Sequence, residues 1–221
     1  LISQPDIEIF VIITHTHWDH IQGIPFFTSA YNPNNRFDIY ACRRDDHGLE
    51  ENLSRQMTHP NFPVPLSIMG STMEFHEVGA GDEFQIGDVK VTTADLNHPG
   101  GAMGVRLDYE GRSLAYCSDH EHEADRKIHP GVETLGREVD MLIYDATYTE
   151  EEYPSRVGWG HSTWEMACEV APLLQVRKLA IFHHEPTHDD ATMDEIGRQA
   201  KVRFPGSFIA QEGLELDLFE D

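Results

Sequence analysis

The sequence of 221 residues is poor in cysteine and lysine and has no long hydrophobic run. Its three cysteines, Cys42, Cys117 and Cys168, lie far apart and form no C-x-x-C pair, which argues against a disulfide framework and against a thiolate zinc site. We therefore expect a protein of the reducing cytoplasm. No stretch of about 18 uncharged apolar residues occurs, so we expect no membrane-spanning helix.

Basic residues are scarce as well. Only 16 Lys and Arg, four of them Lys, stand against 39 Asp and Glu, which gives a formal net charge of −23. Nucleic-acid affinity rests mainly on Lys and Arg that neutralise phosphates, so this composition argues against a long RNA or DNA partner. A small anionic substrate remains compatible with it, because bound metal ions reverse the local field.

The chain shows no internal repeat, low-complexity tract or flexible linker, so we expect one domain over residues 1–221. Residues 7–14 are apolar and rich in β-branched side chains, which predicts a fully buried strand. A short helix is expected from Ile21. The next predicted elements are a strand at 38–41, a helix at 44–58 and a proline-rich irregular loop at 59–71.

Residues 73–118 predict antiparallel β-structure, with turns at Gly87-Asp88 and Glu110-Gly111. The pattern then alternates between strands and helices. The expected elements are a strand at 140–145, a helix at 163–175, a strand at 178–183, a helix at 189–203 and a final strand pair near 207–218. A β-rich half followed by βαβ-like units predicts an α+β fold with two sheets between helices.

The stretch THTHWDHIQG, residues 14–23, places three histidines and an aspartate directly after the first expected strand. His15 and His17 alternate at the end of that strand, so both imidazoles are expected on the same side. Asp19 and His20 follow where the chain must turn. We expect one metal ion at the His15/His17 pair and an adjacent one at Asp19/His20. Imidazole and carboxylate ligands favour Zn²⁺, with Mn²⁺ or Fe as alternatives.

HTHWDH resembles the H-x-H-x-D-H signature of the metallo-β-lactamase superfamily, and later motifs extend the resemblance over nearly the whole chain. It implies an αββα sandwich with two metal ions at the strand ends. It further implies His98 in ADLNHPGG as the third histidine of the first site, Asp119 in LAYCSDHEH as the bridging carboxylate and His183 in KLAIFHHEP as the last histidine of the second. His184 is the alternative to His183.

Two neighbours of Asp119 have no assigned ligand role. His120 and His122 are candidates to support the ligands, and a solvated loop is the other interpretation of this segment.

A second pair of motifs narrows the function. DMLIYDAT places Asp145 at a strand end and GWGHST places His161 before a helix, and together they resemble the phosphodiesterase branch of the superfamily. That branch includes transfer-RNA 3′-processing endonucleases and bacterial cyclic-nucleotide phosphodiesterases, in which an acidic residue orients a phosphate-contacting histidine. A carboxylate keeps an imidazole protonated and aimed, so the imidazolium can stabilise charge on phosphorus or protonate the leaving oxygen. The alternative is a helix cap without a catalytic role.

We therefore expect a binuclear hydrolase of a phosphodiester, with a small substrate such as a cyclic nucleotide, because the acidic composition argues against a long nucleic acid. The resemblance implies attack by a hydroxide shared between the metals, with Asp19, Asp145 and His161 as the catalytic set. Trp159, Tyr148 and Tyr153 offer a face on which a base can stack, although ordinary packing also explains them.

Three alternatives stay open. The first is hydrolysis of a lactone or a thioester by the same metals. The second is RNA 3′-end processing, whose known enzymes carry an RNA-grasping arm that no Gly/Lys-rich insertion supplies in this sequence. The third is a non-catalytic protein that binds or senses a ligand.

The beginning of the chain also carries an expectation. LISQPD has neither a basic region nor an initiating Met, so we expect no signal peptide. The superfamily has several strands before its metal motif and this chain begins one strand ahead of it, so we expect the usual N-terminal strands to be lacking. An exposed sheet edge would result, and a homodimer would cover it.

Overall fold

The computed structural model describes residues 6–42 and 47–220. The chain forms two compact units, one of residues 1–79 and the other of residues 80–221. The expectation of a single domain over 1–221 stays a prediction.

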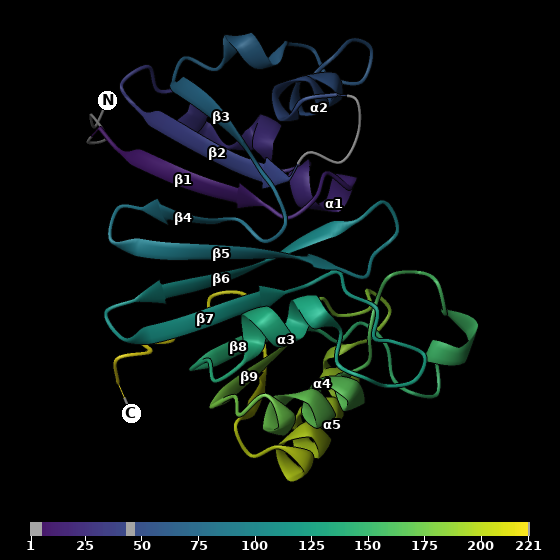
Figure 1. Ribbon diagram of the computed structural model, residues 1–221. Coiled ribbons are helices and arrows are strands. Elements are labelled where there is room, and N and C mark those ends of the chain that lie inside the picture. The colour runs from purple at the N-terminus through teal and green to yellow at the C-terminus, as the bar shows by residue number, and fades with distance from the viewer. Residues whose placement is uncertain (1–5, 43–46, 221) are drawn as a thin grey trace. The chain divides into compact units, whose positions relative to one another are not determined.

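The first unit is built on a three-stranded parallel sheet in the order β1-β2-β3 (Figure 1). Its strands are β1 (Glu8–Ile13), β2 (Arg36–Cys42) and β3 (Thr72–Val78). Helix α2 (Leu49–Gln56) buries Leu49 and Leu53 in a core shared with Phe37 and Ile39 of β2. Short helical turns complete the unit: α1 (Trp18–Ile21), η1 (Ile24–Phe26), η2 (Thr28–Tyr31) and η3 (Leu66–Ile68).

Three expectations for this unit were wrong in detail. The first strand is half-buried and alternates between its two faces, with Phe10 42% exposed, because its only partner among the described residues is β2. The helix after the metal motif begins at Trp18 instead of Ile21. β3 pairs in parallel with β2 and does not open the antiparallel run. The strand at 38–41 and the loop at 59–71 are confirmed; the beginning of the helix expected at 44–58 lies outside the described residues.

The second unit contains a seven-stranded sheet in the order β10-β9-β8-β7-β6-β5-β4. Neighbours from β4 to β7 are antiparallel, whereas β7 to β10 are parallel. The strands are β4 (Glu83–Ile86), β5 (Val89–Leu96), β6 (Ala102–Tyr109), β7 (Arg112–Cys117), β8 (Met141–Asp145), β9 (Lys178–Phe182) and β10 (Ser207–Ile209). Both predicted turns are present, and Gly87, Glu110 and Gly111 have the positive φ that tight hairpins require.

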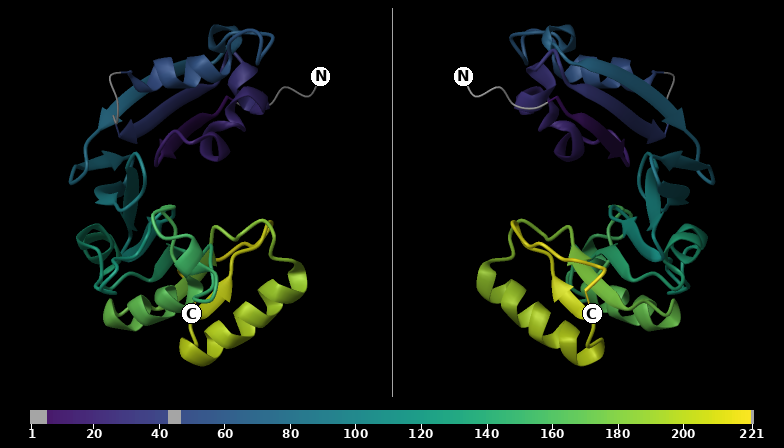
Figure 2. Two further views of the ribbon diagram at one scale, coloured as in Figure 1. Left: turned by 90° about the vertical axis from the view of Figure 1, so that its right-hand side faces the viewer. Right: turned by 90° about the vertical axis from the view of Figure 1, so that its left-hand side faces the viewer.

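Helices cover this sheet through one hydrophobic core. The helices are α3 (Pro130–Gly136), α4 (Trp164–Leu173) and α5 (Asp190–Arg203), and a 3-10 turn, η4 (Tyr153–Ser155), lies between β8 and α4. α4 contacts β8, β9 and α5, while α5 contacts β10 (Figure 1 and Figure 2). α3 was not predicted; it is only seven residues long and starts at Pro130, where the His129 side chain accepts from the backbone N–H of Gly131.

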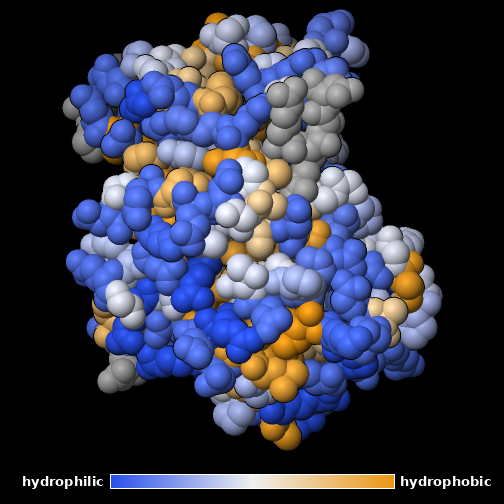
Figure 3. Space-filling view, viewed as in Figure 1, coloured by the Kyte–Doolittle hydropathy of each residue, from blue (hydrophilic) through white to orange (hydrophobic). Residues whose placement is uncertain are grey.

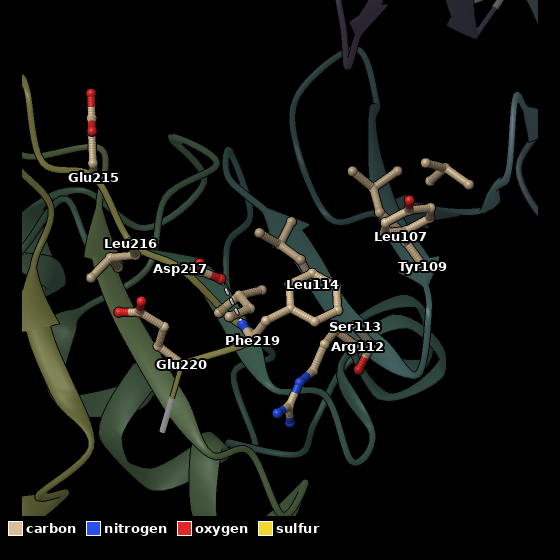
Figure 4. A pocket seen from close by; sticks show the side chains of 12 residues that line it. Leu107, Tyr109, Arg112, Ser113, Leu114, Glu215, Leu216, Asp217, Phe219 and Glu220 are labelled. Atoms are coloured by element: carbon tan, nitrogen blue, oxygen red, sulfur yellow. Dashed lines mark hydrogen bonds between the residues drawn. The ribbon is translucent and has the colours of Figure 1, made fainter.

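The chain after β10 does not form the second strand of the expected final pair. It returns along β6 and β7, where Phe219 meets the Tyr109 ring at 6.3 Å and the Arg112 guanidinium at 6.0 Å (Figure 4). Together these residues line a hollow of about 670 Å³. Tyr109 ends β6 and Arg112 begins β7, so the hollow lies at the opposite end of these strands from His98 and Asp119.

The surface agrees with the acidic composition. Hydrophilic residues cover most of the face shown in Figure 3, with small hydrophobic patches between them. In the part of the chain that the structure describes, no helix has both the length and the apolar character needed to cross a membrane.

The short helix α3 provides a test of the second core. Leu135 is fully buried there, whereas Leu173 at the end of α4 is 65% exposed. We expect Leu135→Ala to lower the free energy of unfolding by about 2–5 kcal/mol, because it removes buried methyl groups and leaves a cavity. The same change at Leu173 should alter it by less than about 1 kcal/mol. Urea denaturation of both variants checks this, and equal losses would contradict the assigned core.

Candidate metal centre

The first cluster of candidate ligands lies directly after β1. His15 is 4% exposed, and its ring lies 4.5 Å from that of His17 and 4.3 Å from that of His20. His17 is the N-cap of α1, so the turn into this helix brings the carboxylate of Asp19 to 3.2 Å from His20 Nε2. The first unit therefore brings all four predicted side chains of THTHWDH together.

The second cluster of candidate ligands lies at one edge of the seven-stranded sheet. His98 follows β5, Asp119 follows β7 and His183 follows β9, while Asp145 is the last residue of β8. These four strands run in the same direction, so their carboxyl ends meet at this edge. His161 comes to the same place from the loop before α4.

Distances within this second cluster are short. His183 Nε2 lies 3.4 Å from Asp119 Oδ1, and the rings of His183 and His161 stack at 4.7 Å with an interplanar angle of 15°. The ring of His98 lies 5.3 Å from that of His161. Ligand atoms of Asp119, Asp145, His161 and His183 all lie within 4.8 Å of one another, which is compact enough to hold a metal ion.

His184 has a different environment from its neighbour. Its Nε2 lies 3.0 Å from the carbonyl oxygen of Ala210, just after β10, whereas His183 is the one beside Asp119. The geometry therefore favours His183 over His184 as a candidate ligand.

Hydrogen bonds at Nδ1 orient the candidate histidines. His98 Nδ1 lies 2.8 Å from the carbonyl oxygen of Gly160, so this nitrogen carries the proton and donates. Thr147 Oγ1 lies 3.0 Å from His183 Nδ1 and has two acceptors for its own proton, namely Asp145 Oδ1 and the carbonyl of His183. His183 Nδ1 is therefore a donor as well, and in both rings Nε2 is the nitrogen left to face an ion.

Metal-binding histidines in proteins use this arrangement, with one nitrogen fixed by the protein and the other directed to the ion. Nε2 atoms combined with carboxylate oxygens are also the donors that zinc-type ions accept. The residues present therefore fit a divalent metal ion.

Asp145 holds the second cluster in place. It is fully buried, and its Oδ2 accepts from His161 Nδ1 at 2.8 Å and from the backbone N–H of Asp119 at 3.0 Å. Its Oδ1 accepts from the backbone N–H groups of Ser162 at 2.9 Å and of Thr147 at 3.2 Å. With both oxygens engaged by these donors, Asp145 acts by positioning its neighbours. The aspartate side chain is long enough to bind His161 directly, because Oδ2 lies 2.8 Å from His161 Nδ1.

Two candidate ligands adopt a left-handed backbone. Asp119 has φ +57° and His183 has φ +59°, a region that residues other than glycine rarely occupy. Such conformations persist where surrounding contacts overdetermine them. Here Asp145 fixes the backbone N–H of Asp119, while Thr147 donates to the carbonyl of His183.

Glu121 was not predicted from the sequence, yet it clamps the loop that carries His161. Its carboxylate is buried and accepts from the hydroxyl of Tyr153 at 2.8 Å and from the backbone N–H groups of Gly158 and Gly160, each at 2.8 Å. Because the carbonyl of Gly160 receives the proton of His98, Glu121 also fixes the partner of that ring. The G-x-G spacing in VGWGH is the signal that a constrained turn stands here.

His120 and His122 are both buried, so the interpretation as a solvated loop was wrong. Burial lowers the pKa of His120 to about 3, which keeps the ring neutral between His129 and Tyr144. Burial is also the main reason that the pKa of His122 is lowered, and the nearby Arg126 acts in the same direction.

Aromatic residues around the loop differ in their exposure. Tyr148 is buried 6.1 Å from the His161 ring, and burial raises its pKa. Burial and the hydrogen bond to Glu121 raise the pKa of Tyr153, while Trp159 is 57% exposed. Packing therefore accounts for the two tyrosines, whereas Trp159 keeps a face open to solvent.

Two glycines of this loop allow a matched test of how His98 is positioned. A Cβ on Gly160 (φ +88°) would lie 2.3 Å from His98 Nδ1, whereas one on Gly158 (φ +86°) would meet nothing within 4 Å. Alanine at Gly158 should lower the unfolding free energy by about 1–2 kcal/mol through left-handed strain. Alanine at Gly160 should lower it further, because its Cβ also clashes with His98 and Pro99. Only Gly160→Ala should also weaken zinc binding, by about tenfold or more, because it displaces a candidate ligand.

Isothermal titration of each purified variant with zinc, together with urea denaturation, separates the two effects. Equal zinc affinity in the Gly158→Ala and Gly160→Ala variants would show that the position of His98 does not affect the ion.

Comparison with known proteins gives one family and a consistent set of relatives. A family model described as a beta-lactamase superfamily domain matches residues 4–184. The chain is 31% identical to ribonuclease Z of Picosynechococcus sp., an alignment that covers 92% of this chain and 77% of the relative. It is 24% identical to ribonuclease Z of Synechococcus sp., covering 94% and 81%.

Solved structures share the fold at lower identity. Human tRNase Z, short form, aligns with a TM-score of 0.69 at 20% identity, and the alignment covers 95% of this chain and 78% of that one. A diphosphatase from the PhnP family aligns with a TM-score of 0.69 at 22% identity, covering 95% and 72%.

Proposed function

Because the chain belongs to the beta-lactamase superfamily domain family, as HTHWDH predicted, we propose that it is a metal-dependent phosphodiesterase that cleaves RNA in the manner of ribonuclease Z. The α+β metallo-β-lactamase fold and the hydrolase class are confirmed by the family match and by the relatives. The choice of RNA as the substrate goes beyond the family match and is our proposal.

The observation that carries the proposal is the Asp145–His161 pair. Asp145 accepts the Nδ1 proton of His161 at 2.8 Å, while the stacked ring of His183 holds His161 beside Asp119. The Nδ1 proton of His161 is thus directed to Asp145, and Nε2 is the nitrogen that can contact a phosphate oxygen. An imidazolium at this position would donate its Nε2 proton to a phosphate oxygen or to the departing oxygen of a phosphodiester, a contact that a thioester does not need.

We propose His15, His17, Asp19, His20, His98, Asp119 and His183 as the ligands of two divalent ions, with zinc as the first choice and Mn²⁺ or Fe as alternatives. Bound ions would supply Lewis acidity and lower the pKa of water for attack on phosphorus. Asp119 is kept in place by Asp145, and His98 by the carbonyl of Gly160, so the protein fixes these donors before any ion binds. His161 then stabilises the charge that develops on the phosphate.

The relatives favour RNA over a cyclic nucleotide. Those with the highest similarity given above are named ribonuclease Z, and one of them reaches 31% identity over most of both chains. This reverses the preference for a small substrate that the composition suggested. Exposed charges are screened by salt, so the net charge of −23 weakens RNA binding mainly at low ionic strength.

A small diester is the second candidate, and two observations favour it. The first is the charge. The second is a difference in length. The alignment with the Synechococcus enzyme has 258 positions, but it contains only 94% of the 221 residues of this chain. At about 50 positions the relative therefore has a residue and this chain has a gap. The expected absence of an RNA-grasping arm stays a prediction that this difference in length supports.

The test is hydrolysis by zinc- or manganese-loaded protein of three substrates: a transfer-RNA precursor with a 3′ trailer, a cyclic nucleotide and bis(p-nitrophenyl) phosphate. We expect cleavage of the precursor, and a fall in kcat of about a hundredfold or more in His161→Ala with unchanged metal content. His47→Ala, a change at a histidine whose side chain is 37% exposed, is the matched control and should keep full activity.

Cleavage of the cyclic nucleotide alone would favour the second candidate. Activity that survives His161→Ala would remove the role given to the Asp145–His161 pair, and hydrolysis of a thioester alone would contradict phosphodiester chemistry.

A further inference from the structure

The loop before His161 presents an aromatic side chain to solvent. Trp159 is 57% exposed and stands two positions before His161 in the chain. An exposed aromatic ring offers a face on which a nucleic-acid base can stack. The mechanism proposed above gives Trp159 no task.

The backbone on both sides of Trp159 is fixed. Gly158 and Gly160 each donate their N–H to the buried carboxylate of Glu121, and the N–H of Trp159 itself donates to the carbonyl of Arg156 at 3.0 Å. The indole is therefore held outward on a rigid turn. A ligand that stacks on a side chain already held in place loses little of its binding free energy to ordering the protein.

A cation lies over the same indole. The guanidinium carbon of Arg156 is 4.8 Å from the centre of the Trp159 ring and 6.0 Å from that of Tyr148. Over the described ranges 6–42 and 47–220, Arg156 makes no ion pair with an acidic side chain, although most arginines of this acidic chain do. Its charge is therefore available to an anionic ligand.

Arg156 and Trp159 also lie near the reacting groups. The ring of Tyr148 is 6.0 Å from the guanidinium carbon of Arg156 and 6.1 Å from the ring of His161. A phosphate at His161 would thus have its neighbouring nucleotide within reach of the indole. Unpaired bases stack on exposed aromatic rings whatever their sequence, and an arginine beside the ring binds the adjoining phosphate.

We propose that Arg156 and Trp159 form a nucleotide platform: the indole stacks the unpaired base next to the scissile bond, and the guanidinium binds the phosphate beside it. The platform rests on the proposed function and specifies its substrate class, a single-stranded ribonucleotide segment that flanks the cleaved diester. It gives the site a means of preferring diesters that carry a base over diesters that do not.

Kinetics with two esters test the platform. The p-nitrophenyl ester of a nucleoside 5′-phosphate and methyl p-nitrophenyl phosphate share a leaving group but differ in the base. We expect Trp159→Ala to raise KM about tenfold for the nucleoside ester, with kcat and the KM of the methyl ester changed less than about twofold. Val157→Ala, at a residue of the same loop that is 61% exposed, should change neither substrate. Equal losses on both esters, or none, would overturn the platform.

A binding measurement separates failure of the platform from failure of the proposed function. Metal-free protein is titrated into a fluorescein-labelled hexaadenylate RNA, and anisotropy gives the Kd without hydrolysis. We expect Trp159→Ala and Arg156→Ala to weaken binding about tenfold, and Trp159→Phe and Val157→Ala to retain it. Binding that requires Trp159 in a protein that hydrolyses no diester would refute the proposed function and keep the platform. No binding by the wild type, or binding unchanged by Trp159→Ala, would overturn the platform whatever the activity.

Discussion

The candidate centre of the second unit depends on one buried charge, the carboxylate of Asp145. It is fully removed from solvent, and a charge in that position is tolerated only where it is paired and hydrogen-bonded. The donors that satisfy it come from Asp119, Thr147 and the segment His161–Ser162, which are separate in the sequence. The hydrogen bonds to this one carboxylate therefore fix the position of Asp119, a candidate metal ligand, and of His161, the imidazole proposed to contact phosphate.

The second constraint is the direction of the strands. The strands β5, β7, β8 and β9 all end at the same edge of the sheet. The side chains at or just after these strand ends therefore lie close together without the help of long loops. The left-handed backbone at Asp119 and His183 then turns the chain sharply away from the sheet. Glu121 adds a second clamp, which fixes the loop that presents Trp159 and the carbonyl that orients His98.

Much of this was open to prediction because metal ligands and tight turns leave strong local signals. A few neighbouring residues were enough to predict three features: the cluster in HTHWDH, the strand-end positions of His98 and Asp145, and the turn at Glu110-Gly111. β3 was misassigned because an amphipathic strand looks the same in a parallel and in an antiparallel sheet. The role of Glu121 could not be predicted either, since the donors it accepts from lie more than 30 residues away and are mostly backbone groups that any sequence carries. The assignment of ligands stays a prediction.

The acidic surface and the ribonuclease Z relatives point to different substrate sizes, but the proposed site would bind the phosphate of either substrate through metal ions and His161. The most direct test is a crystal structure of the zinc-loaded protein with phosphate, using anomalous scattering at the zinc edge. The account predicts zinc bound by His98, Asp119 and His183, with a phosphate oxygen within about 3.2 Å of His161 Nε2. Zinc absent from these side chains, or a phosphate that does not contact His161, would contradict it.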